Sequence, residues 1–145
     1  LEHSIVVKSS PEGVFPYIND LRKAESWNTW MKSDKTMKIE YPGTTTAGVG
    51  AIQKWDSDET GEGSQEIVES KLNEMVKVAL DFREQGTATS SYILKAVDEG
   101  TEITWTFESE ASYPIGRYMG ILIKKEMKES MDEGLELLKG KLSVK

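Results

Sequence analysis

Apolar and polar residues alternate with a period of two through the middle of the chain. In the stretch EMVKVALDFRE, for example, Val76, Val78 and Leu80 are each separated by one residue. Such alternation predicts antiparallel strands with one face buried and the other in water. A hairpin signal, DEG (98–100), joins the last two of these segments. The expected strands are KTMKIEY (35–41), VGAIQKWDSD (49–58), SQEIVESKL (64–72), EMVKVALDFRE (74–84), TATSSYILKAV (87–97) and TEITWTFES (101–109).

The N-terminal part of the chain has a different pattern. The apolar run SIVVKS (4–9) predicts a first strand. Ser10 followed by Pro11 is typical of a helix start, with proline in the first helical position. Pro16 removes a helical donor, so we expect this helix to be short or bent. A second short helix is predicted within LRKAESWNTWMKS (21–33).

The C-terminal part predicts one long amphipathic helix. Apolar residues recur from Pro114 onward at spacings of three, four and sometimes five residues, which places them on one helical face. The expected length is about 25 residues. The apolar positions are Ile115, Tyr118, Met119, Leu122, Met127, Met131, Leu135, Leu138 and Leu142.

The order of these elements predicts an α+β fold. One strand, two short helices, about six further strands and a long helix follow one another without a linker or a repeat. Strands that follow each other as a meander, with helices kept apart from them, indicate one sheet curled around the helix. A chain of 145 residues is long enough for one core, so we expect a single domain over residues 1–145.

Two Gly-x-Gly pairs, GVG (48–50) and GEG (61–63), lie close together in the first half of the chain. A phosphate-binding loop needs a strand before its glycines and a helix after them. Strand patterns follow both pairs here, so we expect bulges, or a sharp bend where backbones approach closely, rather than a phosphate site.

Composition excludes several kinds of function. The chain has no cysteine and a single histidine, His3, which excludes disulfides, thiolate metal sites and a histidine-based catalytic triad. Its net charge of −7 disfavours nucleic acid as a partner. No apolar run reaches the length of a membrane span. The acidic loop DSDE (56–59) lacks the spacing of calcium ligands, so no metal and no cofactor are expected.

Four stretches, in this order, resemble a known family. They are SIVVKSSPEGVFPYINDLRKAESWNTW (4–30), GVGAIQKWDSDETGEG (48–63), GTEITWTF (100–107) and GLELLKGKL (134–142). Together they cover nearly the whole chain and look like the polyketide cyclase/dehydrase-like branch of the START/Bet v 1-like (SRPBCC) superfamily. Each motif is loose, but their order and spacing are fairly specific.

The resemblance implies a helix-grip fold. In this fold a strongly bent antiparallel sheet, here of about six to seven strands, wraps around the C-terminal helix and encloses a cavity. Members of the family mostly bind hydrophobic or amphipathic small molecules. Relatives often carry an apolar segment ahead of the first strand, and the chain starts at Leu1 without a methionine. We therefore expect a soluble, cytoplasmic domain and keep open a membrane anchor ahead of Leu1; the oligomeric state is left open.

The cavity lining is expected from strand parity and from the apolar helix stripe. Aromatic side chains offer large apolar area, and tyrosine and tryptophan keep one polar tip that can orient a ligand. Each of these residues could equally be plain core. The expected ligand-binding residues are Trp30, Trp55, Phe82, Tyr92, Trp105, Phe107, Tyr118, Met119 and Leu122.

Three functions fit the sequence. We expect binding or carriage of an apolar small molecule first, and an enzyme of the cyclase or dehydratase type acting in the same cavity second. The third is a protein-interaction module, like the chaperone regulators of this superfamily. No pair of nucleophile and base can be recognised, so no catalytic residue is assigned. Tyr92 is the most plausible polar group on the inner face, and Gln53 could orient a ligand carbonyl or face solvent.

Overall fold

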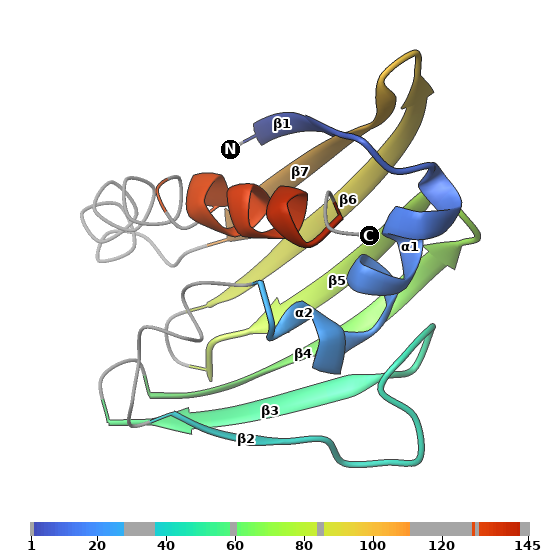
Figure 1. The fold of residues 1–145 in the computed structure, drawn as a ribbon. Helices are drawn as coiled ribbons and strands as arrows, with labels where there is room; N and C mark the ends of the chain where they lie inside the picture. Colours follow the sequence, from blue (N-terminus) through green and yellow to red (C-terminus); the bar gives the residue numbers. More distant parts are fainter. Residues whose placement is uncertain are drawn as a thin grey trace.

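The computed structural model describes residues 2–27, 37–58, 61–83, 86–110, 129 and 131–142. Its centre is an antiparallel sheet of seven strands in the order β1-β7-β6-β5-β4-β3-β2, with helices on one side (Figure 1). This architecture confirms the α+β helix-grip fold that the sequence predicts. The strands are β1 (Glu2–Val7), β2 (Lys38–Glu40), β3 (Ile52–Ser57), β4 (Gly61–Lys71), β5 (Met75–Asp81), β6 (Thr87–Val97) and β7 (Gly100–Glu110).

Two short helices follow β1, as predicted. Helix α1 (Pro11–Asn19) begins at the Ser10 cap, whose hydroxyl accepts a hydrogen bond from the Gly13 amide at 3.3 Å. Asp20 ends α1 and caps α2 (Leu21–Ala24), since its carboxylate accepts from the Arg22 amide at 2.9 Å. The two helices therefore meet at a corner whose inner side buries Ile18 and Leu21.

The C-terminal helix covers residues 131–142 in the described part of the chain. Met131, Leu135 and Leu138 are fully buried, so the apolar stripe does face the core as predicted. Figure 1 shows this helix crossing the inner side of the sheet, with α1 and α2 beside it. The expected helix start at Pro114, and most of the stripe up to Met127, lie outside the described residues.

Strand parity decides which side chains face the helices. On β7, Ile103, Trp105 and Phe107 are buried, while the residues between them are more exposed. The same alternation holds on β5, where Val76 and Val78 are buried. The core therefore lies between the inner face of the sheet and the helices.

The two glycine pairs shape the sheet. Gly48 and Gly50 have positive φ angles of 77° and 94°, and β3 follows them directly. Val49 between them is 61% exposed, so the inward parity expected from Val49 to Trp55 begins only after this turn. A strand, β4, also contains the second pair. The helix that a phosphate loop requires follows neither pair.

Gly63 permits a close contact between two strands. It lies opposite Trp55 in the ladder of β3 and β4. A Cβ atom at Gly63 would overlap the Trp55 indole and lie 2.8 Å from the Asp81 carbonyl oxygen. The indole therefore rests on bare backbone, and only glycine fits below it.

We predict opposite effects for two glycine-to-alanine substitutions. Gly63→Ala should lower the free energy of unfolding by about 1–3 kcal/mol, because the new methyl group must displace Trp55. Gly140→Ala is the matched control, since nothing lies within 4 Å of its Cβ position in the helix. It should raise stability by up to about 1 kcal/mol through helix propensity. Urea unfolding followed by circular dichroism measures both, and equal effects would contradict the contact.

Candidate ligand-binding face

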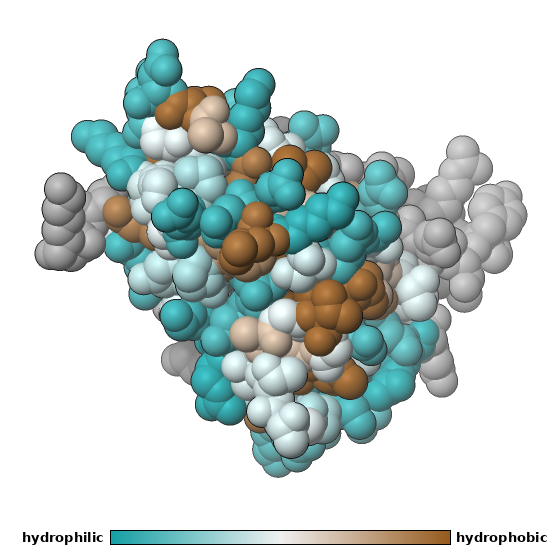
Figure 2. All heavy atoms as spheres, turned by 90° about the vertical axis from the view of Figure 1, so that its right-hand side faces the viewer, coloured by the Kyte–Doolittle hydropathy of each residue, from teal (hydrophilic) through white to brown (hydrophobic). Residues whose placement is uncertain are grey.

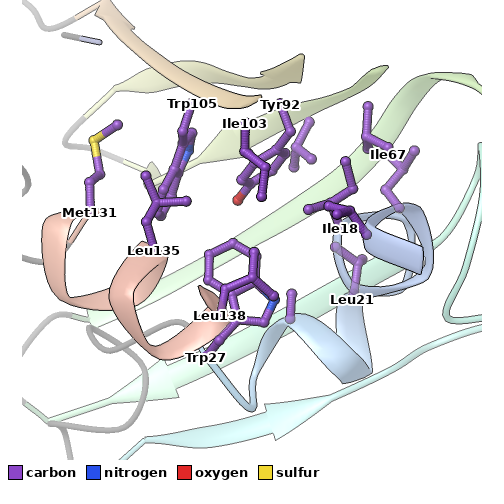
Figure 3. Close-up of a cluster of buried hydrophobic side chains, with 14 of the residues drawn as sticks. Ile18, Leu21, Trp27, Ile67, Tyr92, Ile103, Trp105, Met131, Leu135 and Leu138 are labelled. Atoms are coloured by element: carbon purple, nitrogen blue, oxygen red, sulfur yellow. The ribbon is translucent and has the colours of Figure 1, made fainter. Parts of the chain in front are cut away.

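Trp27, three residues after the end of α2, packs against the inner face of the sheet from the side of the helices (Figure 3). It is fully buried, and its indole Nε1 donates a hydrogen bond to the Tyr17 carbonyl oxygen of α1 at 3.0 Å. Its ring meets Tyr92 and Trp105 edge-on, with centroid distances of 5.8 and 5.5 Å. These three rings form the inner aromatic cluster, which joins the α2 region to β6 and β7.

The C-terminal helix approaches this cluster through a glycine. The Cβ position of Gly134 lies 3.1 Å from the Trp27 carbonyl oxygen and 3.6 Å from the Trp105 ring. A larger side chain would push the helix away from the sheet. Gly134 thus sets how closely helix 131–142 packs on the inner aromatic cluster.

Polar groups are buried within the inner aromatic cluster. The Trp105 indole Nε1 donates to the Ser90 hydroxyl at 2.6 Å, and Ser90 also hydrogen bonds the Tyr92 side chain. Burial raises the pKa of the Tyr92 phenol well above its usual value. Tyr92 therefore stays protonated at neutral pH, and Figure 3 shows its side chain extending from the sheet toward Trp27. It can exchange hydrogen bonds there, but it is a poor base.

A second aromatic pair lies toward the other edge of the sheet. Trp55 of β3 and Phe82, just after β5, have centroids 5.8 Å apart. Trp55 is buried, whereas Phe82 is half-buried. Ala88 and Ser90 are consecutive inward residues of β6, before Tyr92 on the same face. The inner face therefore has small side chains along this part of β6.

A chain of hydrogen bonds runs beside Trp55. Gln65 Nε2 donates to Gln53 Oε1 at 2.5 Å, and Gln53 Nε2 donates to the Tyr41 hydroxyl at 3.0 Å. The Tyr41 hydroxyl in turn donates to a Glu25 carboxylate oxygen. The Arg22 guanidinium lies 4.5 Å from the centre of the Tyr41 ring. Burial, followed by the hydrogen bond to Glu25, raises the pKa of Tyr41. Gln53 is fully buried, so it faces the interior and not solvent.

The predicted site residues fall into two groups. Five lie in the described part of the chain and on the inner side of the sheet, and their contact with a ligand remains a prediction; they are Trp55, Phe82, Tyr92, Trp105 and Phe107. The other four lie outside the described residues, namely Trp30, Tyr118, Met119 and Leu122.

Sequence reasoning missed three residues of this face. Trp27 follows a helix that is too short for its periodicity to show which way the side chain points. A second tryptophan three residues later was a sign that this segment contributes large apolar side chains. Gln65 and Ser90 have inward strand parity, but both are polar and were not assigned to the face. Parity alone could have found these two.

No metal site and no membrane span are found within the described ranges. There, no group of three or more histidine or acidic side chains is arranged to hold an ion. Among the same residues, no helix has the length and hydrophobicity needed to cross a bilayer.

The fold and the aromatic inner face define the class of helix-grip proteins with a curved sheet around a C-terminal helix. The profile of the family described as "Polyketide cyclase / dehydrase and lipid transport" matches residues 1–143. The chain therefore belongs to this family, within the START/Bet v 1-like superfamily that its motifs resemble. No curated protein sequence matches the chain significantly.

Solved structures with the same fold are distant in sequence. CV1439 from Chromobacterium violaceum is 13% identical, with a TM-score of 0.70 over 100% of this chain and 98% of that one. The Aha1 dimer structure from Colwellia psychrerythraea is 18% identical, with a TM-score of 0.63 over 99% and 96%. DynU16, a putative protein in the dynemicin biosynthetic locus, is 12% identical, with a TM-score of 0.68 over 99% and 47%. At these identities the similarity shows the fold alone.

We predict that Tyr92 makes the protein less stable at high pH. An unfolded tyrosine loses its proton near pH 10, whereas buried Tyr92 keeps it to higher pH. Its contribution is therefore complete below about pH 10 and is lost as the pH rises above that value, by up to about 1.4 kcal/mol per pH unit. Urea unfolding between pH 9 and 11.5 should show a steeper loss for the wild type than for Tyr92→Phe. The difference isolates Tyr92 from lysines that titrate in the same range, and parallel curves would contradict its burial.

Proposed function

We propose that this protein binds an apolar or amphipathic small molecule between the inner face of the sheet and the C-terminal helix. The observation that carries the proposal is the composition of that face. It combines two separate aromatic groups with a few buried polar side chains, Gln53, Gln65 and Ser90. Ligand sites are typically apolar surfaces with a small number of polar groups that orient the ligand.

The polar groups favour a binding face over a plain core. A core gains little stability from buried amides where leucine or methionine would fit, because the amides must first lose their hydrogen bonds to water. Here Gln53 and Gln65 are buried side by side next to Trp55. Binding of one polar group of a ligand would account for this buried pair. Membership of a family described by lipid transport supports the same conclusion.

The outer surface gives less support to a protein-docking role. Figure 2 shows apolar side chains in several groups with hydrophilic residues between them on the face it displays. Exposed large apolar residues in the described part of the chain include Val49, Val68 and Leu72. Scattered exposed apolar residues are normal for a soluble domain and need no partner.

Catalysis has weaker support than binding. Tyr92 is buried among Trp27 and Trp105, and its pKa is raised, so it does not serve as a base near neutral pH. A protonated phenol in this position can instead hydrogen bond a ligand. Binding alone therefore explains the buried groups of the inner face.

We predict that enlarging Ala88 blocks binding. The probe is N-phenylnaphthylamine, a neutral apolar dye whose fluorescence rises on leaving water. Ala88→Leu should weaken its binding about tenfold or more while stability stays nearly unchanged, because the leucine takes the volume meant for the ligand. Ala79→Leu is the matched control, since Ala79 lies on the outward face of β5. It should leave the dye affinity unchanged.

The same pair of variants can overturn the proposal. In a filled core, Ala88→Leu would overpack and lower the free energy of unfolding by about 1–3 kcal/mol. Such a loss, together with no dye binding by the wild type, would show that side chains already occupy the face. Equal dye affinities for Ala88→Leu and Ala79→Leu would place the dye elsewhere.

A further inference from the structure

We propose that Gln65 recognises the polar group of the ligand and selects a hydroxyl over an ether or a carboxylate. This inference rests on the proposed binding function and specifies the ligand class, an apolar molecule that carries a neutral hydrogen-bond donor. It follows from the direction of the hydrogen-bond chain formed by Gln65, Gln53, Tyr41 and Glu25.

The direction of the chain is set at its Glu25 end. The Tyr41 hydroxyl lies within reach of a Glu25 carboxylate oxygen and, at 3.4 Å, of the Leu21 carbonyl oxygen. Both groups only accept hydrogen bonds, so the single proton of Tyr41 points to one of them. The Tyr41 oxygen is then left as an acceptor for Gln53. Gln53 must therefore turn its amide nitrogen toward Tyr41, at the observed distance of 3.0 Å.

The orientation of Gln53 in turn sets that of Gln65. With its nitrogen toward Tyr41, Gln53 presents its amide oxygen to the next strand. Gln65 must then donate through Nε2, as it does at 2.5 Å. The order of donors and acceptors leaves Gln65 Oε1 at the end of the chain. Within the described residues, the Gln65 side chain makes one hydrogen bond, the one to Gln53.

Gln65 thus presents its amide oxygen to the ligand, and the hydrogen-bond chain that ends at Glu25 fixes this orientation. The aligned dipoles run from the negative Glu25 to this oxygen, so the open end attracts a donor and repels an anion. Gln65 is only 9% exposed, so its amide oxygen has little access to water and a hydroxyl partner on the inner face is favourable.

The place of Gln65 in the sheet suits such a ligand. Gln65 pairs with Leu80, and Leu80 pairs with Ala88 on the next strand. Adjacent strands are about 4.8 Å apart, so Gln65 lies roughly 10 Å across the sheet from Ala88. A molecule resting on Ala88 with an aromatic-sized apolar body can therefore place one polar group at Gln65.

Three probes with the same ring system test the proposal at pH 7. They are 2-naphthol, 2-methoxynaphthalene, which lacks the donor, and 2-naphthoate, which carries a negative charge. Each displaces N-phenylnaphthylamine from the wild-type protein, and the inhibition constants are compared. We expect 2-naphthol to bind about five- to tenfold more tightly than either of the others, as one net hydrogen bond allows.

Two variants test whether the preference for 2-naphthol comes from the hydrogen-bond chain. Gln65→Met keeps the shape of the side chain and should make the three probes equal. Glu25→Gln replaces the carboxylate, which only accepts hydrogen bonds, by an amide that can also donate. Both directions of the hydrogen-bond chain are then allowed. The preference for 2-naphthol should therefore fall to about twofold. Glu66→Gln removes the same charge from the exposed face of β4 and should keep the full preference. Thermal melting confirms that each variant is folded.

Each outcome decides between the two proposals. Dye binding without a preference for 2-naphthol overturns the role of Gln65 and leaves the binding function standing. A preference that persists in Gln65→Met overturns it as well and points to another group, such as Tyr92. No dye binding by the wild type overturns the binding function and this inference with it.

Discussion

The packing of Trp27 holds the described elements in their relative positions. Its indole nitrogen is tied to the Tyr17 carbonyl of α1, its ring faces Tyr92 and Trp105, and Gly134 of the C-terminal helix lies against it. One fully buried side chain therefore connects the N-terminal helices, the sheet and the last helix. The width of any space between sheet and helix depends on this contact, because a smaller residue here would let the helix settle onto the strands.

Around this contact the inner face has two requirements to meet. It must bury enough apolar area to stabilise the domain, and in our proposal it must also leave room for a ligand. In the proposal these two tasks fall on different parts of the sheet. The inner aromatic cluster packs against helix 131–142, whereas the small residue Ala88 and the two glutamines lie toward Trp55. Polar groups in this second region can turn general hydrophobic binding into selection of one kind of molecule.

Strand parity made much of this arrangement predictable. The pleat forces alternate residues to one face, so the sequence alone is enough to place Trp55, Tyr92 and Trp105 on the inner side. The direction of the sheet's curvature and the class of the fold followed from the order of elements and the family motifs. Parity failed at Val49, because the positive φ angles of Gly48 and Gly50 turn the chain just before β3.

The hydrogen-bond chain could not be predicted in the same way. The contact between Gln53 and Gln65 depends on the register of β3 and β4, which the turn between them determines and which parity does not reveal. Its connection to Glu25 depends on how the segment after α2 lies over Tyr41, and this is a tertiary contact between residues 16 positions apart. Trp27 was missed for a related reason, since neither helical nor strand periodicity applies where it stands.

The most direct test of the account is where an apolar molecule binds. Nuclear Overhauser effects between N-phenylnaphthylamine and the methyl groups of the isotopically labelled protein would locate it. The account predicts contacts to the buried Ala88 methyl on the sheet and to the methyl groups of buried Leu135 or Leu138 on the C-terminal helix. Contacts confined to outward residues such as Ala79 and Val68 would contradict it, because the dye would then lie on the outside of the sheet.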